Sequence, residues 1–236
     1  IKTAIEYWRS TKPRCMGTLY WQINDIWPVA SWSSLDYGGQ WKLMHYMARR
    51  FYNLINVVAV PSSDNAGIAL RAINDTGRPV SIALEVLAVR VTGQSRKLFS
   101  GNSAVGPDAA ITVTTAHVAD LAVDEFLYFV WKDAKGAVLG ANDYFPRPYK
   151  AYELVDATVT ANWSDRDGSA VLTLQSDRPA FFTTATVDVP GYFSDNAFTL
   201  LPGMPVELTF QPRHGASVTS DHLKGSLKLR HLAQTF

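Results

Sequence analysis

Three of the seven tryptophans in this 236-residue chain fall between residues 21 and 32, and polar residues separate them. They are Trp21, Trp27 and Trp32, with Asn24 and Asp25 between the first two. An indole face stacks on the C–H face of a sugar ring, while carboxamide and carboxylate groups bond its hydroxyls. We therefore predict that these five residues bind a carbohydrate.

The same residues have other interpretations. Each tryptophan, taken alone, could equally be a core residue, and Asn24 and Asp25 could shape their loop by bonding its backbone. Binding is favoured because the residues share one loop after an apolar segment, and binding residues concentrate on loops held by a rigid scaffold. Asp36, later in this loop, is more typical of a turn or a helix start than of a catalyst.

The remaining reactive side chains predict no second site. Cys15 is the only cysteine, so no intrachain disulfide and no thiolate metal cluster can form. His45 has no second histidine or carboxylate at metal-ligand spacing, which favours a packing or hydrogen-bonding role. Glu6 is interpreted as a solvated surface carboxylate. We expect no metal and no cofactor.

The elements that hold the tryptophan loop follow from the spacing of apolar residues. Ile1 to Thr11 has one apolar helical face, and Pro13 ends that helix. Met16 to Gln22 is almost continuously apolar, as in a parallel strand covered on both faces. A loop from Ile23 to Gly39 then leads into an amphipathic helix from Gln40 to Asn53. Helix, strand and helix in this order form the repeating unit of an α/β barrel.

After Asn56 the apolar period changes from 3.6 to 2, which predicts β structure. Seven short strands fit an Ig-like sandwich, with a bulge near Val86 and Leu87 where the apolar phase slips. Gly101-Asn102 and Ala134-Lys135-Gly136 are typical of turns. The predicted strands are Val57 to Val60, Ile68 to Ile73, Val80 to Val91, Lys97 to Ser100, Ile111 to Thr115, Phe126 to Lys132 and Ala137 to Phe145.

A second all-β unit begins at about Lys150. Turn signals interrupt it at Asp165 to Gly168, Pro190-Gly191 and Pro202-Gly203. Its predicted strands are Leu154 to Ala161, Ala170 to Gln175, Ala180 to Val189, Tyr192 to Leu201, Val206 to Phe210 and Ser226 to Leu232.

Composition limits the partners of the chain. The formal net charge is +1, and 47% of the residues are hydrophobic. No basic patch interleaves with aromatic residues, and no apolar run approaches the roughly 18 residues of a membrane helix. We therefore expect neither a nucleic acid nor a membrane as partner.

The segment WQINDIWPVASWSSLDYGGQWK, from Trp21 to Lys42, resembles the part of family 2 β-mannosidases, a group of glycoside hydrolases, that closes the catalytic barrel. The positions that carry the resemblance are Trp21, Asn24, Asp25, Trp27, Pro28, Trp32, Ser33, Ser34, Asp36, Tyr37, Trp41, His45, Tyr46, Arg49 and Arg50. A less specific resemblance to the terminal Ig-like domain of these enzymes spans Tyr192 to Asn196 and Leu200 to Gly203.

The resemblance implies a multidomain fold, with the terminal part of a (β/α)8 TIM barrel at 1–55 and all-β Ig-like sandwich domains at 56–149 and 150–236. It implies a retaining, exo-acting enzyme that hydrolyses terminal non-reducing β-D-mannose from β-mannosides and manno-oligosaccharides. The nucleophile and acid/base glutamates are expected upstream of Ile1, so this chain alone should be inactive. Its expected partners are that substrate and the N-terminal remainder of the enzyme. A periplasmic, secreted or lysosomal location is implied, and the cytoplasm stays open.

Two alternatives remain at this point. Other family 2 exo-glycosidases, such as exo-β-glucosaminidases and β-glucuronidases, share the implied architecture, although the runs Trp21 to Asp25 and Ser31 to Ser34 favour a mannosidase. Alternatively, the two sandwiches are a non-catalytic carbohydrate-binding or scaffolding module. That module would bind a glycan through exposed aromatic residues within 57–236.

Overall fold

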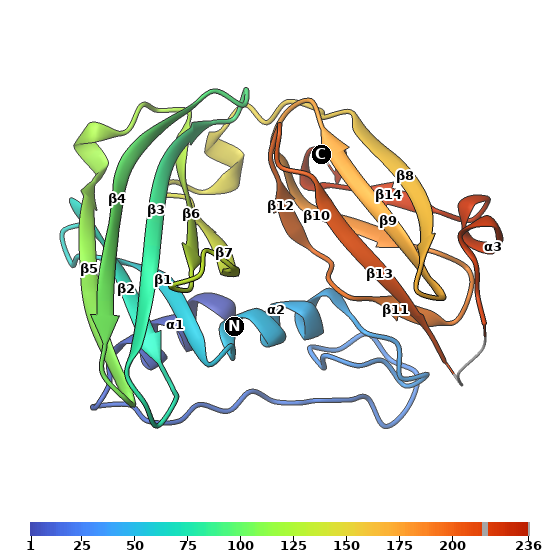
Figure 1. Cartoon of the computed structure of the whole chain (residues 1–236), viewed down its shortest axis with the longest axis horizontal. Helices are drawn as coiled ribbons and strands as arrows, with labels where there is room; N and C mark the ends of the chain where they lie inside the picture. Colours follow the sequence, from blue (N-terminus) through green and yellow to red (C-terminus); the bar gives the residue numbers. More distant parts are fainter. Residues whose placement is uncertain (214–216, 236) are drawn as a thin grey trace. The chain divides into compact units, whose positions relative to one another are not determined.

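The computed structural model describes residues 1–213 and 217–235. Its internal contacts divide the chain into two compact units. Unit 1 contains Ile1–Tyr20 and Ala48–Glu153, and unit 2 contains Trp21–Met47 and Leu154–Phe236. Each unit contains one pair of antiparallel β-sheets (Figure 1).

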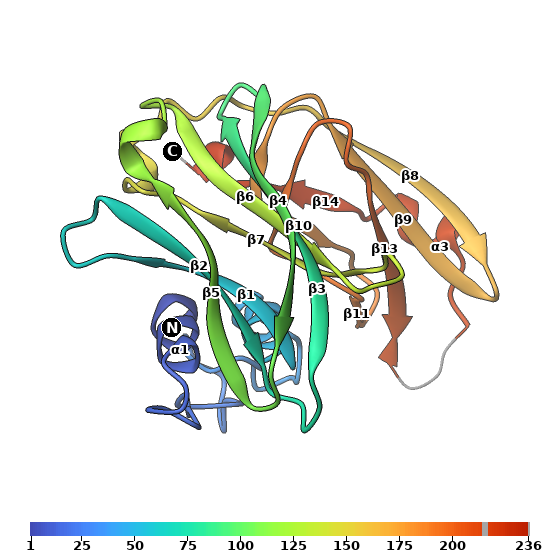
Figure 2. The same ribbon diagram turned by 60° about the vertical axis from the view of Figure 1, so that its left-hand side comes forward.

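The sandwich of unit 1 has strand orders β1-β2-β5 and β4-β3-β6-β7. Figure 2 shows β2 and β5 running side by side in the smaller sheet. Alternating side chains of the two sheets meet in one apolar core that includes Val57, Leu84 and Phe129. The strands are β1 (Ile55–Pro61), β2 (Gly67–Asn74), β3 (Val80–Arg90), β4 (Ser95–Val105), β5 (Ala109–His117), β6 (Glu125–Lys132) and β7 (Val138–Tyr144), with short 3-10 helices η1 (Val118–Asp120) and η2 (Tyr149–Ala151).

All seven strands predicted for this region are present, and the predicted bulge is confirmed by a register shift between Val86 and Leu87. The predicted turn at Gly101-Asn102 is wrong, because both residues lie inside β4. Gly101 has a packing role there: a Cβ at this position would lie 2.7 Å from the Phe99 ring. The absence of a side chain at Gly101 therefore leaves room for the aromatic ring. From the sequence alone, this glycine resembles a turn signal.

Both predicted helices form, as α1 (Lys2–Ser10) and α2 (Leu43–Phe51). In unit 1, the buried Arg9 joins α1 to the chain after α2, since it donates to the carbonyl oxygens of Phe51 and Asn53 and to Asp75. The interpretation of Glu6 as a solvated carboxylate is wrong. Glu6 is buried, accepts a hydrogen bond from Asn142 and pairs with Lys2, and its burial raises the pKa of the carboxyl.

The predicted strand from Met16 to Gln22 is not formed, and this segment is irregular. A strand needs a neighbour for its backbone hydrogen bonds, and no strand of residues 1–213 and 217–235 pairs with it. Thr18 donates its hydroxyl to the hydroxyl oxygen of Tyr52 and Tyr20 stacks on the ring of Tyr52, whereas Leu19 is 93% exposed. The Ig-like sandwich part of the predicted fold is thus confirmed. In the segment predicted as a barrel strand, apolar side chains such as Leu19 are exposed to solvent.

The sandwich of unit 2 has strand orders β11-β13-β9-β8 and β12-β10-β14. Its core includes Leu172, Leu208 and Phe210. The elements are β8 (Val159–Arg166), β9 (Ser169–Ser176), β10 (Ala180–Thr186), β11 (Gly191–Phe193), β12 (Phe198–Leu200), β13 (Val206–Pro212), α3 (Ser220–Lys224), β14 (Lys228–Arg230) and η4 (Leu232–Thr235).

Two strand predictions in unit 2 need correction. The first strand is β8, which starts at Val159 instead of Leu154 and extends through Arg166. The single strand predicted from Tyr192 to Leu201 is two strands, β11 and β12, in different sheets. The chain leaves the first sheet at Asn196, whose buried side chain bonds both the N–H and the C=O of Ala185. That carboxamide replaces a ladder partner, and the apolar run is interrupted at Ser194-Asp195-Asn196, residues that favour turns.

Candidate functional site

The tryptophan loop, defined as residues 21–42, is held by its own backbone within unit 2. Asn24 forms a parallel bridge with Leu35, and Leu35 forms an antiparallel bridge with Trp41. The N–H of Leu35 donates to Ile23 O at 2.7 Å, and the N–H of Asp25 donates to Leu35 O at 3.1 Å. Ser34 is buried and donates its hydroxyl to Ile23 O at 3.0 Å. A long segment without regular structure is therefore fixed at several points.

Asp25 lies at the centre of this loop, with a side chain that is fully buried. Lys42 Nζ lies 2.7 Å from Asp25 Oδ2 and 2.8 Å from Ser33 Oγ, and the hydroxyl of Ser31 donates to Asp25 Oδ1. The Lys42 ammonium, followed by the Ser31 hydroxyl, lowers the pKa of the Asp25 carboxyl. Both carboxylate oxygens are engaged inside the loop, so the geometry favours the loop-shaping role that the sequence left open for Asp25.

The three tryptophans point out of this scaffold. Trp21 is 76% exposed, Trp27 is 61% exposed and Trp32 is 70% exposed. In this chain they are not core residues. Asn24 is also exposed, although its Nδ2 donates to Asp25 O at 3.1 Å. Trp21, Asn24, Trp27 and Trp32 are thus exposed on one loop, whereas Asp25 is buried; that these residues bind a sugar stays a prediction.

His45 and Asp36 have structural partners. His45 Nδ1 lies 3.0 Å from Ser34 Oγ, so the histidine has the hydrogen-bonding role favoured by the sequence. Asp36 Oδ1 accepts the N–H of Gln40 at 2.7 Å, and its carbonyl accepts the N–H of Gly39 at 2.8 Å. Asp36 therefore closes a tight turn, as expected.

Sequence reasoning missed Lys42, which falls within the helix predicted from Gln40 to Asn53. The residue precedes α2, and its N–H donates to Ser34 O at 2.9 Å, which directs its side chain into the loop. The sequence did contain an indication of this role, because Lys42 is the only lysine or arginine between residues 21 and 48. A buried carboxylate in that span had no other local partner.

The linkage between Asp25 and Lys42 predicts how the loop responds to acid. The ordinary pKa of Asp is 3.8, and that of folded Asp25 is lower, so the unfolded loop binds its proton first. Loop stability is therefore complete above about pH 4 and declines as the pH falls through the folded-state pKa. We expect the amides of Asp25 and Leu35 to stay protected from hydrogen exchange down to about pH 4 and to lose protection below it.

Lys42→Met tests that prediction, since it removes the largest cause of the lowered pKa. Above about pH 4, protection should then be lower than in the parent, and it should fall less on acidification, because the pKa of folded Asp25 moves up toward its ordinary value. Lys97→Met is the matched control, because the Lys97–Glu85 pair is exposed and lies in unit 1. Equal pH profiles for the parent and Lys42→Met would contradict the assignment of Lys42.

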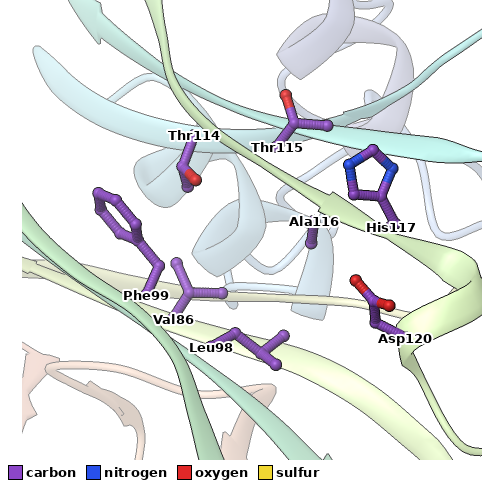
Figure 3. Close-up of a pocket in the computed structure, with 8 residues that line it drawn as sticks. All are labelled: Val86, Leu98, Phe99, Thr114, Thr115, Ala116, His117 and Asp120. Carbon is purple, nitrogen blue, oxygen red and sulfur yellow. The ribbon is translucent and has the colours of Figure 1, made fainter.

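Outside the tryptophan loop, three features of the described residues are relevant to function: a small hollow, the spacing of possible metal ligands, and the length and polarity of the helices. Unit 1 has a small hollow of about 100 Å³ between β4, β5 and η1, lined by groups that include Phe99, His117 and Asp120 (Figure 3). Ligand sites usually measure roughly 300 Å³ or more. No three His, Cys, Asp or Glu side chains of the described residues gather closely enough to hold a metal ion. Within residues 1–213 and 217–235, every helix is too short or too polar to span a membrane.

Comparisons with known proteins agree with the fold. Residues 154–235 match the Ig_mannosidase family, an Ig-fold domain. The β-mannosidase of Capra hircus is 30% identical over 100% of this chain and 28% of its own length. The crystal structure of a β-D-mannosidase from Dictyoglomus thermophilum covers 98% of this chain and 28% of its own, with a TM-score of 0.86 and 26% identity. An exo-chitosanase from Amycolatopsis orientalis covers 98% of this chain and 32% of its own, with a TM-score of 0.71; at 19% identity this is a likeness of fold alone.

Fold and sequence together show that the chain is related to β-mannosidases, and that residues 154–235 match the Ig-fold domain of the Ig_mannosidase family. The chain spans 25% to 28% of the length of the curated relatives that it matches.

Proposed function

We propose that this chain is the carboxyl-terminal part of a retaining, exo-acting β-mannosidase that releases terminal non-reducing β-D-mannose from β-mannosides and manno-oligosaccharides. One observation carries the proposal: Trp21, Trp27 and Trp32 are exposed together on a loop whose base is fixed by buried polar contacts. Rigid, exposed indoles with a fixed spacing suit a ring-shaped ligand. The relationship to β-mannosidases supports mannose as the sugar.

Residues 1–55 are proposed to form the end of the catalytic (β/α)8 barrel, followed by Ig-like domains at 56–149 and 150–236. The sequence of helix, apolar segment and helix supports this proposal. The exposure of Met16 (57%) and Leu19 (93%) also supports it. Such apolar side chains are normally buried, and two neighbouring barrel strands outside this chain would cover them. In this proposal the partner of residues 16–22 is the rest of the same enzyme.

Within the proposed site, Trp21 forms the wall of the subsite for the mannosyl ring, since it lies at the carboxyl end of the proposed strand. Trp27 and Trp32 line the side of the leaving group, and Asn24 bonds a sugar hydroxyl. Asp25 contributes indirectly, because its pairing with Lys42 holds the loop that carries these residues.

The cleavage step needs two carboxyl groups about 5 Å apart, a nucleophile and an acid/base. The glutamates of this chain do not supply them. Four of them pair with a lysine or arginine in structural contacts: Glu6, Glu85, Glu125 and Glu207. We therefore propose that both catalytic glutamates lie outside this chain and that the chain alone is inactive.

The proposal is tested by assaying the complete protein against aryl β-mannoside, β-glucosaminide and β-glucuronide. We expect kcat/KM for the mannoside to exceed the other two values by at least about 100-fold, because a site that bonds particular hydroxyls rejects epimers and isosteres strongly. A higher kcat/KM for the glucosaminide or the glucuronide would contradict the proposed mannosidase activity and favour another family 2 activity.

The non-catalytic module is less well supported. It requires exposed aromatic residues on the sandwiches, and none of the aromatic side chains within 57–213 and 217–235 is exposed. Trp131, for example, is 2% exposed in the core of unit 1. Trp21, Trp27 and Trp32 are exposed instead on the loop that precedes both sandwiches.

A further inference from the structure

The edge of the unit 2 sandwich contacts the tryptophan loop through an aromatic stack. The rings of Trp41 and Tyr192 have centroids 4.2 Å apart and planes within 10° of parallel. Tyr192 lies in the middle of β11, which pairs with β13 opposite Gln211. Its neighbour Gly191 approaches β13 so closely that a Cβ would lie 2.5 Å from Gln211 O. The tyrosine ring is therefore presented by a tightly fixed strand.

Arg213, directly after β13, makes a second contact with the same loop. Its guanidinium donates to Gly38 O, and its backbone N–H donates to Pro190 O at 3.0 Å. Gly39 has a φ of +75° and lies under this guanidinium, since a Cβ there would be 2.9 Å from Arg213 Nη2. The turn closed by Asp36 thus fits against an arginine of the Ig-like domain.

From Trp41, unbroken contacts lead to the residues beside Trp21. The Trp41 and His45 rings have centroids 4.4 Å apart, and His45 Nδ1 lies 3.0 Å from Ser34 Oγ. That hydroxyl donates to Ile23 O, and the N–H of Ser34 lies 3.2 Å from Gln22 O. Gln22 and Ile23 directly follow Trp21 in the chain. The base of the indole is therefore coupled to the sandwich edge by side chains that are far apart in sequence.

We infer that Tyr192 and Arg213 are positioning residues for the proposed sugar site: they hold the tryptophan loop in its binding shape without touching substrate. The expected effect on catalysis rests on the proposed function. The positioning of the loop by these two residues does not depend on it. The carboxyl-terminal Ig-like domain then has a defined role in the enzyme, which is to fix the loop that carries Trp21, Trp27 and Trp32.

Two variants test the inference, Tyr192→Ala and Arg213→Ala. In this chain, each should raise the hydrogen-exchange rates of the Ser34 and Leu35 amides by about three- to tenfold, because each removes one of two contacts at the loop base. In the complete protein, kcat/KM for an aryl mannoside should fall by a similar factor. Tyr192→Phe keeps the stacked ring and should restore both values to within twofold of the parent.

Phe198→Ala is the matched control for a merely structural effect. Phe198 packs on the core of the same sandwich from β12, so this variant should lower the unfolding midpoint of unit 2 without changing exchange at Ser34 and Leu35. The inference is overturned if Tyr192→Ala and Arg213→Ala both leave that exchange within twofold of the parent, or if Phe198→Ala changes it equally. If Tyr192→Ala does not fold, Arg213→Ala alone decides in the same way. A complete protein that hydrolyses no aryl glycoside would refute the proposed function, while hydrogen exchange in this chain would still decide the positioning.

Discussion

Replacing Trp21 by alanine in the complete protein should lower kcat/KM for an aryl β-mannoside by more than tenfold. The indole is 76% exposed at the start of a loop whose next residues are fixed by Ser34, so its face is available for stacking without a large ordering cost. Losing one good stacking contact in the transition state costs on the order of 1.4 kcal/mol, which corresponds to a tenfold change. Steady-state kinetics of the purified variant provide the measurement.

A control of the same chemistry is Trp8→Ala. Trp8 lies on α1 and is 45% exposed, outside the tryptophan loop, so its removal should leave kcat/KM within about twofold of the parent. Circular dichroism and the thermal midpoint establish that both variants fold. A folded Trp21→Ala enzyme with nearly parental kcat/KM would remove Trp21 from the proposed site.

The β strands were the part of the fold most open to prediction, because a period of two directly reports which side chains face a core. In β3, the apolar phase slips at Val86 and Leu87, and the register shift lies at the same two residues. Prediction failed where a residue type had a packing role that resembles a turn signal. Gly101 is the example, since it is a glycine inside β4 that makes room for Phe99.

Other failures came from contacts that are distant in sequence. The predicted strand from Tyr192 to Leu201 is divided by Asn196, whose carboxamide bonds the backbone of Ala185. Nothing in the apolar pattern of those residues indicates such a partner. The segment from Met16 to Gln22 has a strand pattern but no strand to pair with among the described residues, and a pattern alone does not make a ladder.

The candidate site could be predicted only in part, because some of its features are local in sequence and others depend on contacts between distant residues. The grouping of Trp21, Trp27 and Trp32 is visible in the sequence, and so is the likeness of the loop to one family. The contacts that hold the loop are not visible: Lys42 reaches back to Asp25, and Tyr192 stacks on Trp41 from a distant part of the chain. Only the folded chain brings those pairs together.

Leu19→Ala should have almost no effect on the stability of this chain and a large effect on that of the complete protein. In this chain Leu19 is 93% exposed, so the free energy of unfolding should change by less than about 0.5 kcal/mol. In the complete protein, residues 16–22 are proposed to form a barrel strand covered on both faces. Truncating a buried leucine there should cost about 2–5 kcal/mol, through lost burial and the cavity left behind.

Leu127→Ala is the matched control, since Leu127 is fully buried in the core of unit 1. It should cost about 2–5 kcal/mol in this chain, where denaturant unfolding measures it. In the complete protein, the thermal midpoint of the barrel should fall with Leu19→Ala, and that of the sandwich should fall with Leu127→Ala. If Leu19→Ala leaves the complete protein as stable as the parent, residues 16–22 are not a buried barrel strand. In that case the exposed apolar side chains of this segment need another partner, and Trp21 loses the strand end that the proposed site requires.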